Sequence, residues 1–463
     1  MAKDVEGNSG IPTCDAYFDA IQSRKRLPSS LQESLTAAFA QIPVSSFPEV
    51  PGGKVIEIQS DATILDAVQI LSGNKILAAP VRNAEAVSST NWKGRYLGII
   101  DYSAVILWVL ENAELAAFAL SAGSATAAAL GTGAVGGLGA LAIGATSPVA
   151  VAGLTLAASG AALAGGIATE KSVGRDAATA ADHMGEQFYK LLSQEEPFKS
   201  TTVKSVVEMY RWAPFLPVAV DSYMLTVLLL LSKYRLRNVP VIDVDKFYIK
   251  NFITQSAVVR GLKQCKGRDW FDCIAARPLS DLGLPFMSYD EVNIGLYCIK
   301  NRSTVPFPLS CGIMRSLVIS IQSDDLILEG FKRMKDNRIG GLPVVEDSNR
   351  KIVGSLSIQD IRFLLLKPEL FSGFRELTVM NFIKAIETTC PNSGTQLPTC
   401  APDTCLGSVI DSLASRSVHR IYVVNGDEVI GVVTLRDVIS CFIYEPPGYL
   451  EEFFCSGIKE MVA

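Results

Sequence analysis

The sequence predicts an α/β protein in which one short unit occurs four times and the units pair into two modules. Each copy places an aspartate 19 positions before a proline or, in the last copy, a tyrosine; the pairs are Asp61 and Pro80, Asp221 and Pro240, Asp324 and Pro343, and Asp403 and Tyr422. In the first and third copies the aspartate ends the tripeptide Gln-Ser-Asp. Four equal intervals indicate an internal repeat, which has to be recognised before a fold is assigned.

The third copy shows the predicted elements in order. Asp324, like Asp221, is placed to cap a helix, in which Ile327, Phe331 and Met334 recur at helical spacing and form one apolar face. Residues 337–341 form the turn that ends this helix. A strand at 344–345, a polar turn at 346–350 and a second strand at 352–357 follow, and the next helix opens at Asp360. A unit this short cannot bury its own apolar face, so we expect units to pair.

Composition excludes several classes of protein. The 463 residues are 49% hydrophobic and 19% charged, which excludes a largely disordered chain. The formal charge of -5 argues against a nucleic-acid partner, and we expect none. The two histidines, His183 and His419, are too few for most metal sites and catalytic triads, so we expect neither a metal nor catalytic residues.

Cysteine usage and the first residues bear on location. The ten cysteines are dispersed without a C-x-x-C pair, which favours reduced thiols. Residues 1–10 contain no apolar run of the kind that marks a secretory signal. We therefore expect a cytoplasmic or nuclear protein.

The units resemble cystathionine-β-synthase (CBS) repeats, which pair into two-repeat Bateman modules. Four in one chain resemble the regulatory γ subunits of the AMP-activated and sucrose-non-fermenting-related protein kinases. The plant branch is particularly similar, through residues 211–217 (RWAPFLP), 232–240 (SKYRLRNVP) and 267–271 (GRDWF). The resemblance implies a non-catalytic subunit with a catalytic α and a scaffolding β partner, and a role in energy and carbohydrate signalling.

The resemblance covers about residues 40–445 and implies a division of the chain. The expected parts are a mobile N-terminal segment (1–39), repeat 1 (40–112), an Ala/Gly-rich insertion (113–172), repeat 2 (195–262), a linker (263–314) with an atypical insertion at 293–318, repeat 3 (315–368), repeat 4 (385–445) and a C-terminal tail (446–463).

A hydroxyl and a carboxylate three positions apart end the second strand of repeats 3 and 4, as Ser357 with Asp360 and Thr434 with Asp437. This pattern resembles the CBS nucleotide signature, in which the carboxylate accepts hydrogen bonds from both ribose hydroxyls and the Ser/Thr lies near the phosphate. An ionised carboxylate has the lone pairs for a diol, and a helix N-terminus favours its charge. The alternative is that both aspartates are only helix caps.

The corresponding positions of repeats 1 and 2 are alanines, Ala104 and Ala257. A methyl group cannot bind a diol, so we expect residues 40–262 to form a nucleotide-poor or empty module. Residues 315–445 are expected to hold the competent sites.

Phosphates require cations, and repeat 4 has them in His419-Arg420, which resembles the family's His-Arg dipeptide. Repeat 3 retains an arginine, Arg338. Arginine makes forked, permanently charged contacts to phosphate, and histidine a contact that can depend on pH. We expect an adenosine nucleotide, AMP, ADP or ATP, as a regulatory ligand.

Residues 115–169 carry no charge and are rich in Ala and Gly. They are long enough for two membrane spans, but Ala and Gly contribute little transfer energy, so we expect no membrane anchor and favour a helical hairpin or low-complexity insertion. Residues 131–136 match G-x-G-x-x-G, but no buried strand precedes them, and composition explains the match. The alternative functions are a stand-alone CBS sensor, a membrane-tethered regulator and a purely structural γ-like subunit that binds no nucleotide.

Overall fold

The computed structural model describes residues 16–50, 53–86, 92–110, 112, 199–210, 215–245, 248–284, 318–346, 350–367, 370, 374, 376–389 and 397–454. The expectations for the Ala/Gly-rich insertion, the G-x-G-x-x-G match at 131–136 and nearly all of the insertion at 293–318 lie outside these residues.

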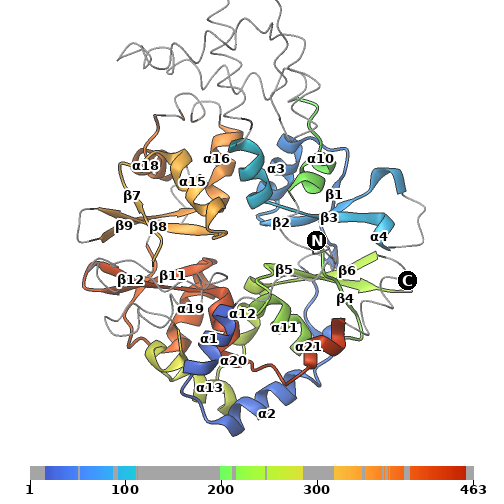
Figure 1. Ribbon diagram of the computed structural model, residues 1–463, viewed down its shortest axis with the longest axis vertical. Coiled ribbons are helices and arrows are strands. Elements are labelled where there is room, and N and C mark those ends of the chain that lie inside the picture. The colour runs from blue at the N-terminus through green and yellow to red at the C-terminus, as the bar shows by residue number, and fades with distance from the viewer. Residues whose placement is uncertain are drawn as a thin grey trace, which may run out of the picture.

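Four units of the same topology surround the centre of the molecule (Figure 1). In each, a two-residue strand pairs in parallel with the next strand after a helical crossover, and that strand pairs antiparallel with a third. Unit A contains β1 (Ile58–Gln59), α3 (Ile64–Gly73), β2 (Ala78–Arg82), η3 (Ala84–Ala86), α4 (Trp92–Arg95) and β3 (Tyr96–Asp101). Unit B contains β4 (Val218–Ala219), α11 (Met224–Ser232), β5 (Asn238–Asp243), β6 (Tyr248–Thr254) and α12 (Gln255–Lys263).

The C-terminal units repeat this order. Unit C contains β7 (Ile321–Gln322), α15 (Ile327–Asp336), β8 (Gly341–Glu346), β9 (Lys351–Ser357), η5 (Ile358–Asp360) and α16 (Ile361–Leu366). Unit D contains β10 (Thr399–Cys400), α19 (Leu406–Arg416), β11 (Arg420–Asn425), β12 (Glu428–Thr434) and α20 (Leu435–Phe442). The short α21 (Tyr449–Glu452) follows. The predicted internal repeat is therefore present, with the 19-position interval spanning the turn, crossover helix and second strand.

The crossover helices begin later than the sequence analysis expects. Asp221 and Asp324 do not cap them: α11 begins after Tyr223 and α15 after Leu326. The reason is that four residues, 220–223 in unit B and 323–326 in unit C, separate the first strand from the helix. In unit C, Asp325 Oδ2 of this connection accepts the backbone N–H of Gln322 at 3.1 Å. All nine residues of α11 are buried, as expected for a helix that is apolar on every side.

The segment before each unit packs on the other unit of its module. The segments are α2 (Ser29–Phe39) with η1 (Val44–Ser46), α10 (Val203–Met209), α13 (Asp269–Ala275) with η4 (Leu279–Leu282), and α18 (Val379–Thr389). In each case a backbone hydrogen bond joins the segment to the partner unit: Val44 N to Ser222 O (2.7 Å), Val203 N to Ala62 O (2.8 Å), Leu279 N to Thr404 O (3.0 Å) and Val379 N to Asp325 O (2.9 Å). Units A and B are thus interlocked as one module, and units C and D as another.

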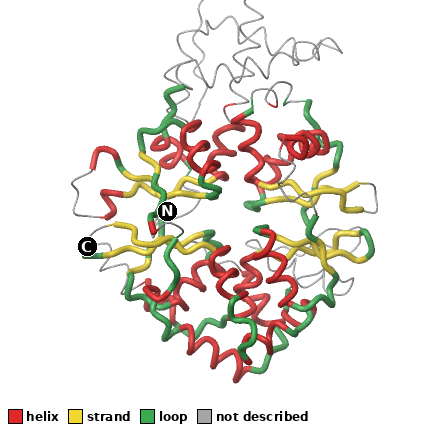
Figure 2. The backbone as a smooth tube through the Cα atoms, turned by 180° about the vertical axis from the view of Figure 1, so that it is seen from behind, coloured by secondary structure: helices red, strands yellow, loops and turns green. Residues whose placement is uncertain are grey.

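Sheets join the units within a module, and helices join the two modules. Glu428 pairs with Lys351, which makes units C and D one six-stranded sheet, and an apolar cluster containing Tyr96 and Phe252 joins units A and B. Two large apolar cores combine unit A with unit C and unit B with unit D. Strands therefore occupy the middle of the molecule and helices its two ends (Figure 2).

The N-terminal segment differs from the expected mobile chain. Within residues 1–39, those from 16 onward form α1 (Ala16–Arg24) and α2. Phe18 and Ile21 are only 2% and 1% exposed in the core of units B and D. Four apolar side chains of this otherwise polar segment, Phe18, Ile21, Leu27 and Leu35, are buried in that core.

Candidate functional site

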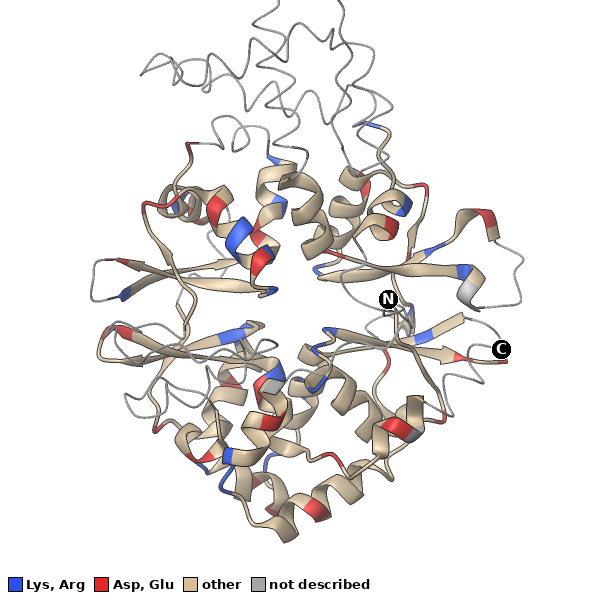
Figure 3. Cartoon of the chain, viewed as in Figure 1, with Lys and Arg blue, Asp and Glu red and all other residues tan. Residues whose placement is uncertain are grey.

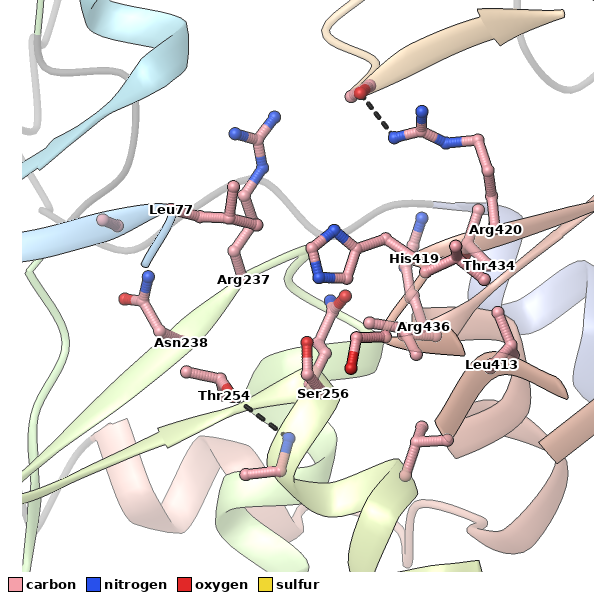
Figure 4. Close-up of a pocket in the computed structure, with 18 of the residues that line it drawn as sticks. Leu77, Arg237, Asn238, Thr254, Ser256, Leu413, His419, Arg420, Thr434 and Arg436 are labelled. Carbon is pink, nitrogen blue, oxygen red and sulfur yellow. Dashed lines mark hydrogen bonds between the residues drawn. The ribbon is translucent and has the colours of Figure 1, made fainter. Parts of the chain in front are cut away.

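One cavity of about 2550 Å³ lies at the centre, where all four units meet. Its lining residues include Leu77 of unit A, Arg237 of unit B and His419 of unit D (Figure 4). Arg338 of unit C also lines it. Lys and Arg positions, blue in Figure 3, lie at the inner ends of the strands. The cavity extends beyond the expected site within residues 315–445, because units A and B line it as well.

The turn between crossover helix and second strand supplies a cation in three units. Lys75, Arg235, Arg338 and Ser417 each stand five positions before the proline or tyrosine of the repeat, and each has a left-handed φ, between 53° and 57°. All four line the cavity. Non-glycine residues adopt this conformation at a cost of about 1–3 kcal/mol, so the fold must impose it at every turn.

This register corrects the interpretation of Arg338 as the counterpart of Arg420. Arg338 corresponds to Lys75 and Arg235, whereas Arg420, two positions before Tyr422, corresponds to Gly341 of unit C. Arg235 Nη2 donates to the Arg338 carbonyl at 3.5 Å, which brings the turns of units B and C together. The equal intervals could have shown this correspondence.

Arg420 extends from unit D into unit C. Its Nη2 donates a short hydrogen bond to the Gly340 carbonyl. A Cβ at Gly341 would lie 1.6 Å from Arg420 Nη1, so only glycine leaves room for the guanidinium. A Cβ at Gly340 would lie 3.2 Å from Arg420 Nη2 and 3.9 Å from Arg237 Nη2, which shows that both guanidinium groups converge on this loop.

His419 lies among these cations. Its Nδ1 is 3.2 Å from Gln359 Nε2, and its ring projects between Arg237 and Arg420 (Figure 4). Burial, followed by the charges of Arg420, Arg237 and Arg260, lowers the pKa of His419 to about 4. The imidazole is therefore neutral near pH 7, and its contact is not a switch in the physiological range.

Arg237 and Arg260 are functional candidates that the sequence analysis does not include. Arg237 stands three positions before Pro240, as His419 does before Tyr422, so the repeat register contained the signal. Arg237 Nη1 lies 3.3 Å from Asp101 Oδ2, and this carboxylate from unit A directs it. Nothing in the spacing indicates Arg260, which reaches the cavity from α12 through the packing of unit B on unit D.

The hydroxyl–carboxylate pairs both form capping boxes. Asp360 Oδ2 accepts the Ser357 N–H at 2.8 Å, and Asp437 Oδ2 accepts the Thr434 N–H and hydroxyl, both at 2.7 Å. Burial raises the pKa of Asp360 to about 6 and also raises that of Asp437. Capping and ligand binding are compatible, because a carboxylate has a second oxygen.

The two pairs differ in their relation to the cavity. Thr434 and Asp437 line it, whereas Ser357 and Asp360 are not among its lining residues, although Arg420 lies close enough to stabilise the ionised form of Asp360. Asp437 is 2% exposed, and the Tyr17 side chain hydrogen-bonds to its carboxylate in addition to Thr434. Its place on the cavity lining makes Asp437 the stronger ligand candidate.

The alanines of the first module occupy equivalent helix starts. Thr254 Oγ1 accepts the Ala257 N–H at 3.1 Å, and Asp101 Oδ1 accepts the Ala104 N–H at 3.0 Å. Asp101 therefore caps its helix with one oxygen and holds Arg237 with the other.

Comparisons with known proteins identify the family. The CBS domain model matches residues 310–367 and 393–444, which correspond to units C and D. The Arabidopsis thaliana "SNF1-related protein kinase regulatory subunit gamma-1-like" is 60% identical over 464 residues, covering 99% of this chain and 98% of that protein. The Arabidopsis "SNF1-related protein kinase regulatory subunit gamma-1" is 32% identical, covering 92% of this chain and 87% of that protein.

A human protein, "5'-AMP-activated protein kinase subunit gamma-3", is 28% identical over 141 residues, which are 30% of this chain and 27% of that protein. Within the part of the chain that the structure describes, no helix is both long and apolar enough to cross a membrane. The relatives that match nearly the whole chain are regulatory subunits of a kinase. The chain belongs to the family of SNF1-related protein kinase regulatory γ subunits.

Proposed function

We propose that this chain is a non-catalytic γ subunit that binds an adenosine nucleotide at the central cavity and works in a complex with a catalytic α and a scaffolding β subunit. The observation that carries the proposal is the convergence of cations from units B, C and D on one cavity. Two unit charges 4 Å apart interact by about 4 kcal/mol at a dielectric constant typical of protein surfaces, so several cations favour a phosphate strongly.

Each expected site residue has a role in this proposal. Arg338, His419 and Arg420 bind phosphate oxygens, together with Arg237. Asp437 accepts the ribose hydroxyls at the edge of the cavity, with Thr434 beside it, and Ser357 with Asp360 form the corresponding position of unit C. The name of the human relative, an AMP-activated kinase subunit, supports an adenosine nucleotide.

Regulation follows from linkage. A nucleotide that contacts units B, C and D together stabilises the arrangement in which their cations converge. It changes kinase activity only to the extent that the complex binds it with different affinity in two states. The relatives are named as subunits of SNF1-related and AMP-activated protein kinases, which supports a role in energy and carbohydrate signalling. The proposed location is the cytoplasm or nucleus.

Calorimetric titration with AMP and with adenosine tests the proposal. Arg420→Gln should weaken AMP binding about tenfold or more, since a hydrogen bond to a charged group contributes about 1.5–3 kcal/mol, and should leave adenosine binding unchanged. Lys266→Gln is the control, because the Lys266 side chain is 74% exposed. Equal AMP affinity in wild type and Arg420→Gln would refute the phosphate site. Co-purification of α and β kinase chains with the tagged protein tests the complex.

A further inference from the structure

Helix α1 is an addition to the four-unit pattern. Each unit has one lead-in segment that packs on its module partner, and α2, α10, α13 and α18 account for all four. Helix α1 precedes α2 and has no counterpart before the other units among the described residues. It packs instead on α20, the helix that opens with Thr434 and Asp437, and on η4.

Specific hydrogen bonds hold α1 against the C-terminal end of α20. Gln22 Nε2 donates to the Ser440 carbonyl at 3.0 Å. Lys25 Nζ, at the end of α1, donates to the carbonyls of Ser440 (3.2 Å), Cys441 (3.4 Å) and Ile443 (3.0 Å). A lysine ammonium satisfies the carbonyls that the last turn of a helix leaves without partners and complements their negative dipole.

The opposite end of α1 reaches the start of α20. Tyr17 lies under the Arg436 guanidinium, whose Cζ is 5.1 Å from the ring centroid. Burial, followed by the charge of Asp437, raises the pKa of the Tyr17 phenol well above its usual value, so the two groups are close neighbours. Tyr17, Asp19, Ala20 and Ser23 line the cavity at this point.

With α1 in place, Asp437 is covered. One of its oxygens accepts from Thr434, and the whole residue is 2% exposed. A ribose diol needs direct access to a carboxylate oxygen, and the Tyr17 side chain already hydrogen-bonds to this carboxylate. Ribose at Asp437 and Tyr17 at Asp437 are therefore alternatives.

We propose that α1 is an internal competitor of the nucleotide, which covers the Asp437 position of unit D until a ligand displaces it. The inference rests on the proposed function, because it takes the ligand to be an adenosine nucleotide. When α1 leaves, Tyr17 moves with it and the Asp437 carboxylate becomes accessible. A regulatory partner that captures α1 would raise nucleotide affinity, and one that holds α1 in place would lower it.

The seat of α1 offers a precise way to test this. Gly283, with a left-handed φ of 72°, follows η4 directly under α1. A Cβ there would lie 2.4 Å from the Ile21 carbonyl oxygen and 2.8 Å from the Lys25 nitrogen. Both are backbone atoms, so Gly283→Ala must push α1 away. Gly426 has a similar φ of 62°, with no atom within 4 Å of its Cβ position, which makes Gly426→Ala a matched control for backbone strain.

The experiment is calorimetric titration of AMP into the full chain. Gly283→Ala and Tyr17→Ala should each tighten AMP binding by up to about tenfold, since removing a competing state raises the competent fraction. Gly426→Ala should not. Adding Asp437→Asn to either variant should abolish the gain. In the wild type, AMP should accelerate tryptic cleavage at residues 24–26, where Lys25 is now buried.

The outcomes separate this inference from the proposed function. If wild type binds AMP and both unseating variants bind it equally or more weakly, α1 does not compete, although the proposed function stands. If AMP protects residues 24–26 from trypsin, α1 is part of the bound state and the inference is overturned. If no variant binds AMP, the proposed function fails and the inference fails with it. Tyr17→Ala leaves the backbone of Gly283 intact, so misfolding of the glycine variant cannot decide the result.

Discussion

Gly341→Ala should disconnect Arg420 from unit C. The added Cβ would lie 1.6 Å from Arg420 Nη1 and 2.3 Å from its Cζ, so the guanidinium cannot remain beside Gly340. The Cβ would also lie 2.7 Å from the Leu356 carbonyl oxygen, a backbone atom of β9 that cannot rotate away. The φ of Gly341 is not left-handed, and the effect is therefore steric rather than conformational.

The expected magnitude follows from the hydrogen bond that is lost. Arg420 donates to the Gly340 carbonyl, and a hydrogen bond to a charged group contributes about 1.5–3 kcal/mol. We expect the free energy of unfolding to fall by at least this amount, and the AMP dissociation constant to rise about tenfold or more.

Urea unfolding and AMP calorimetry measure the two effects. Gly73→Ala is the control: no atom lies within 4 Å of its Cβ position in α3, so it should be neutral or stabilising by up to about 1 kcal/mol. A double-mutant cycle with Arg420→Gln should show that the two changes are not additive. Additive losses, or unchanged stability and affinity in Gly341→Ala, would refute the steric link between units C and D.

Three further predictions follow from single side chains. His419 should titrate near pH 4 by NMR, because the fold lowers its pKa to about 4. The stability that the neutral imidazole contributes is present above pH 6.5 and is lost as pH falls toward 4, and a titration midpoint above pH 6 would contradict the cationic cluster. Asp360→Asn should stabilise the protein at pH 7 but not at pH 3.5, because the fold raises the pKa of the Asp360 carboxyl to about 6 and the folded protein loses stability as pH rises through that value. Equal urea midpoints of variant and wild type at pH 7 would argue against burial as the cause of the raised pKa. Lys25→Met should lower the free energy of unfolding by about 1.5–3 kcal/mol, because it removes the ammonium that donates to the last carbonyls of α20. The control Lys266→Met, at an exposed side chain, should change the free energy of unfolding by less than about 0.5 kcal/mol, and equal effects of the two variants would exclude a capping role for Lys25.

The repeat could be predicted from the sequence because each unit uses the same short path between strands. The interval from aspartate to proline spans a turn, a crossover helix and part of a strand, whose lengths are set locally. The hydroxyl–carboxylate pairs were also predictable, since a capping box depends on residues three positions apart. Helix starts were less so: a turn placed Asp324 outside α15, although it was expected to cap it.

The remaining features depend on contacts between distant segments. Arg260 reaches the cavity because unit B packs against unit D, and no local pattern in α12 indicates this, whereas the repeat register contained the signal for Arg237. The seat of α1 on α20 joins residues more than 400 positions apart, as the Lys25 contacts show. The polar composition of residues 1–39 therefore suggested a mobile segment, because the surface that buries its few apolar side chains could not be identified from the segment alone.

The most direct test of the shared cationic site is the AMP dissociation constant of Arg237→Gln, measured by calorimetry beside that for adenosine. Arg237 belongs to unit B, outside the two units that the CBS domain model matches. The shared site predicts that AMP binds the variant about tenfold or more weakly than wild type, with adenosine binding unchanged. An unaltered AMP affinity would contradict it and confine any nucleotide site to units C and D.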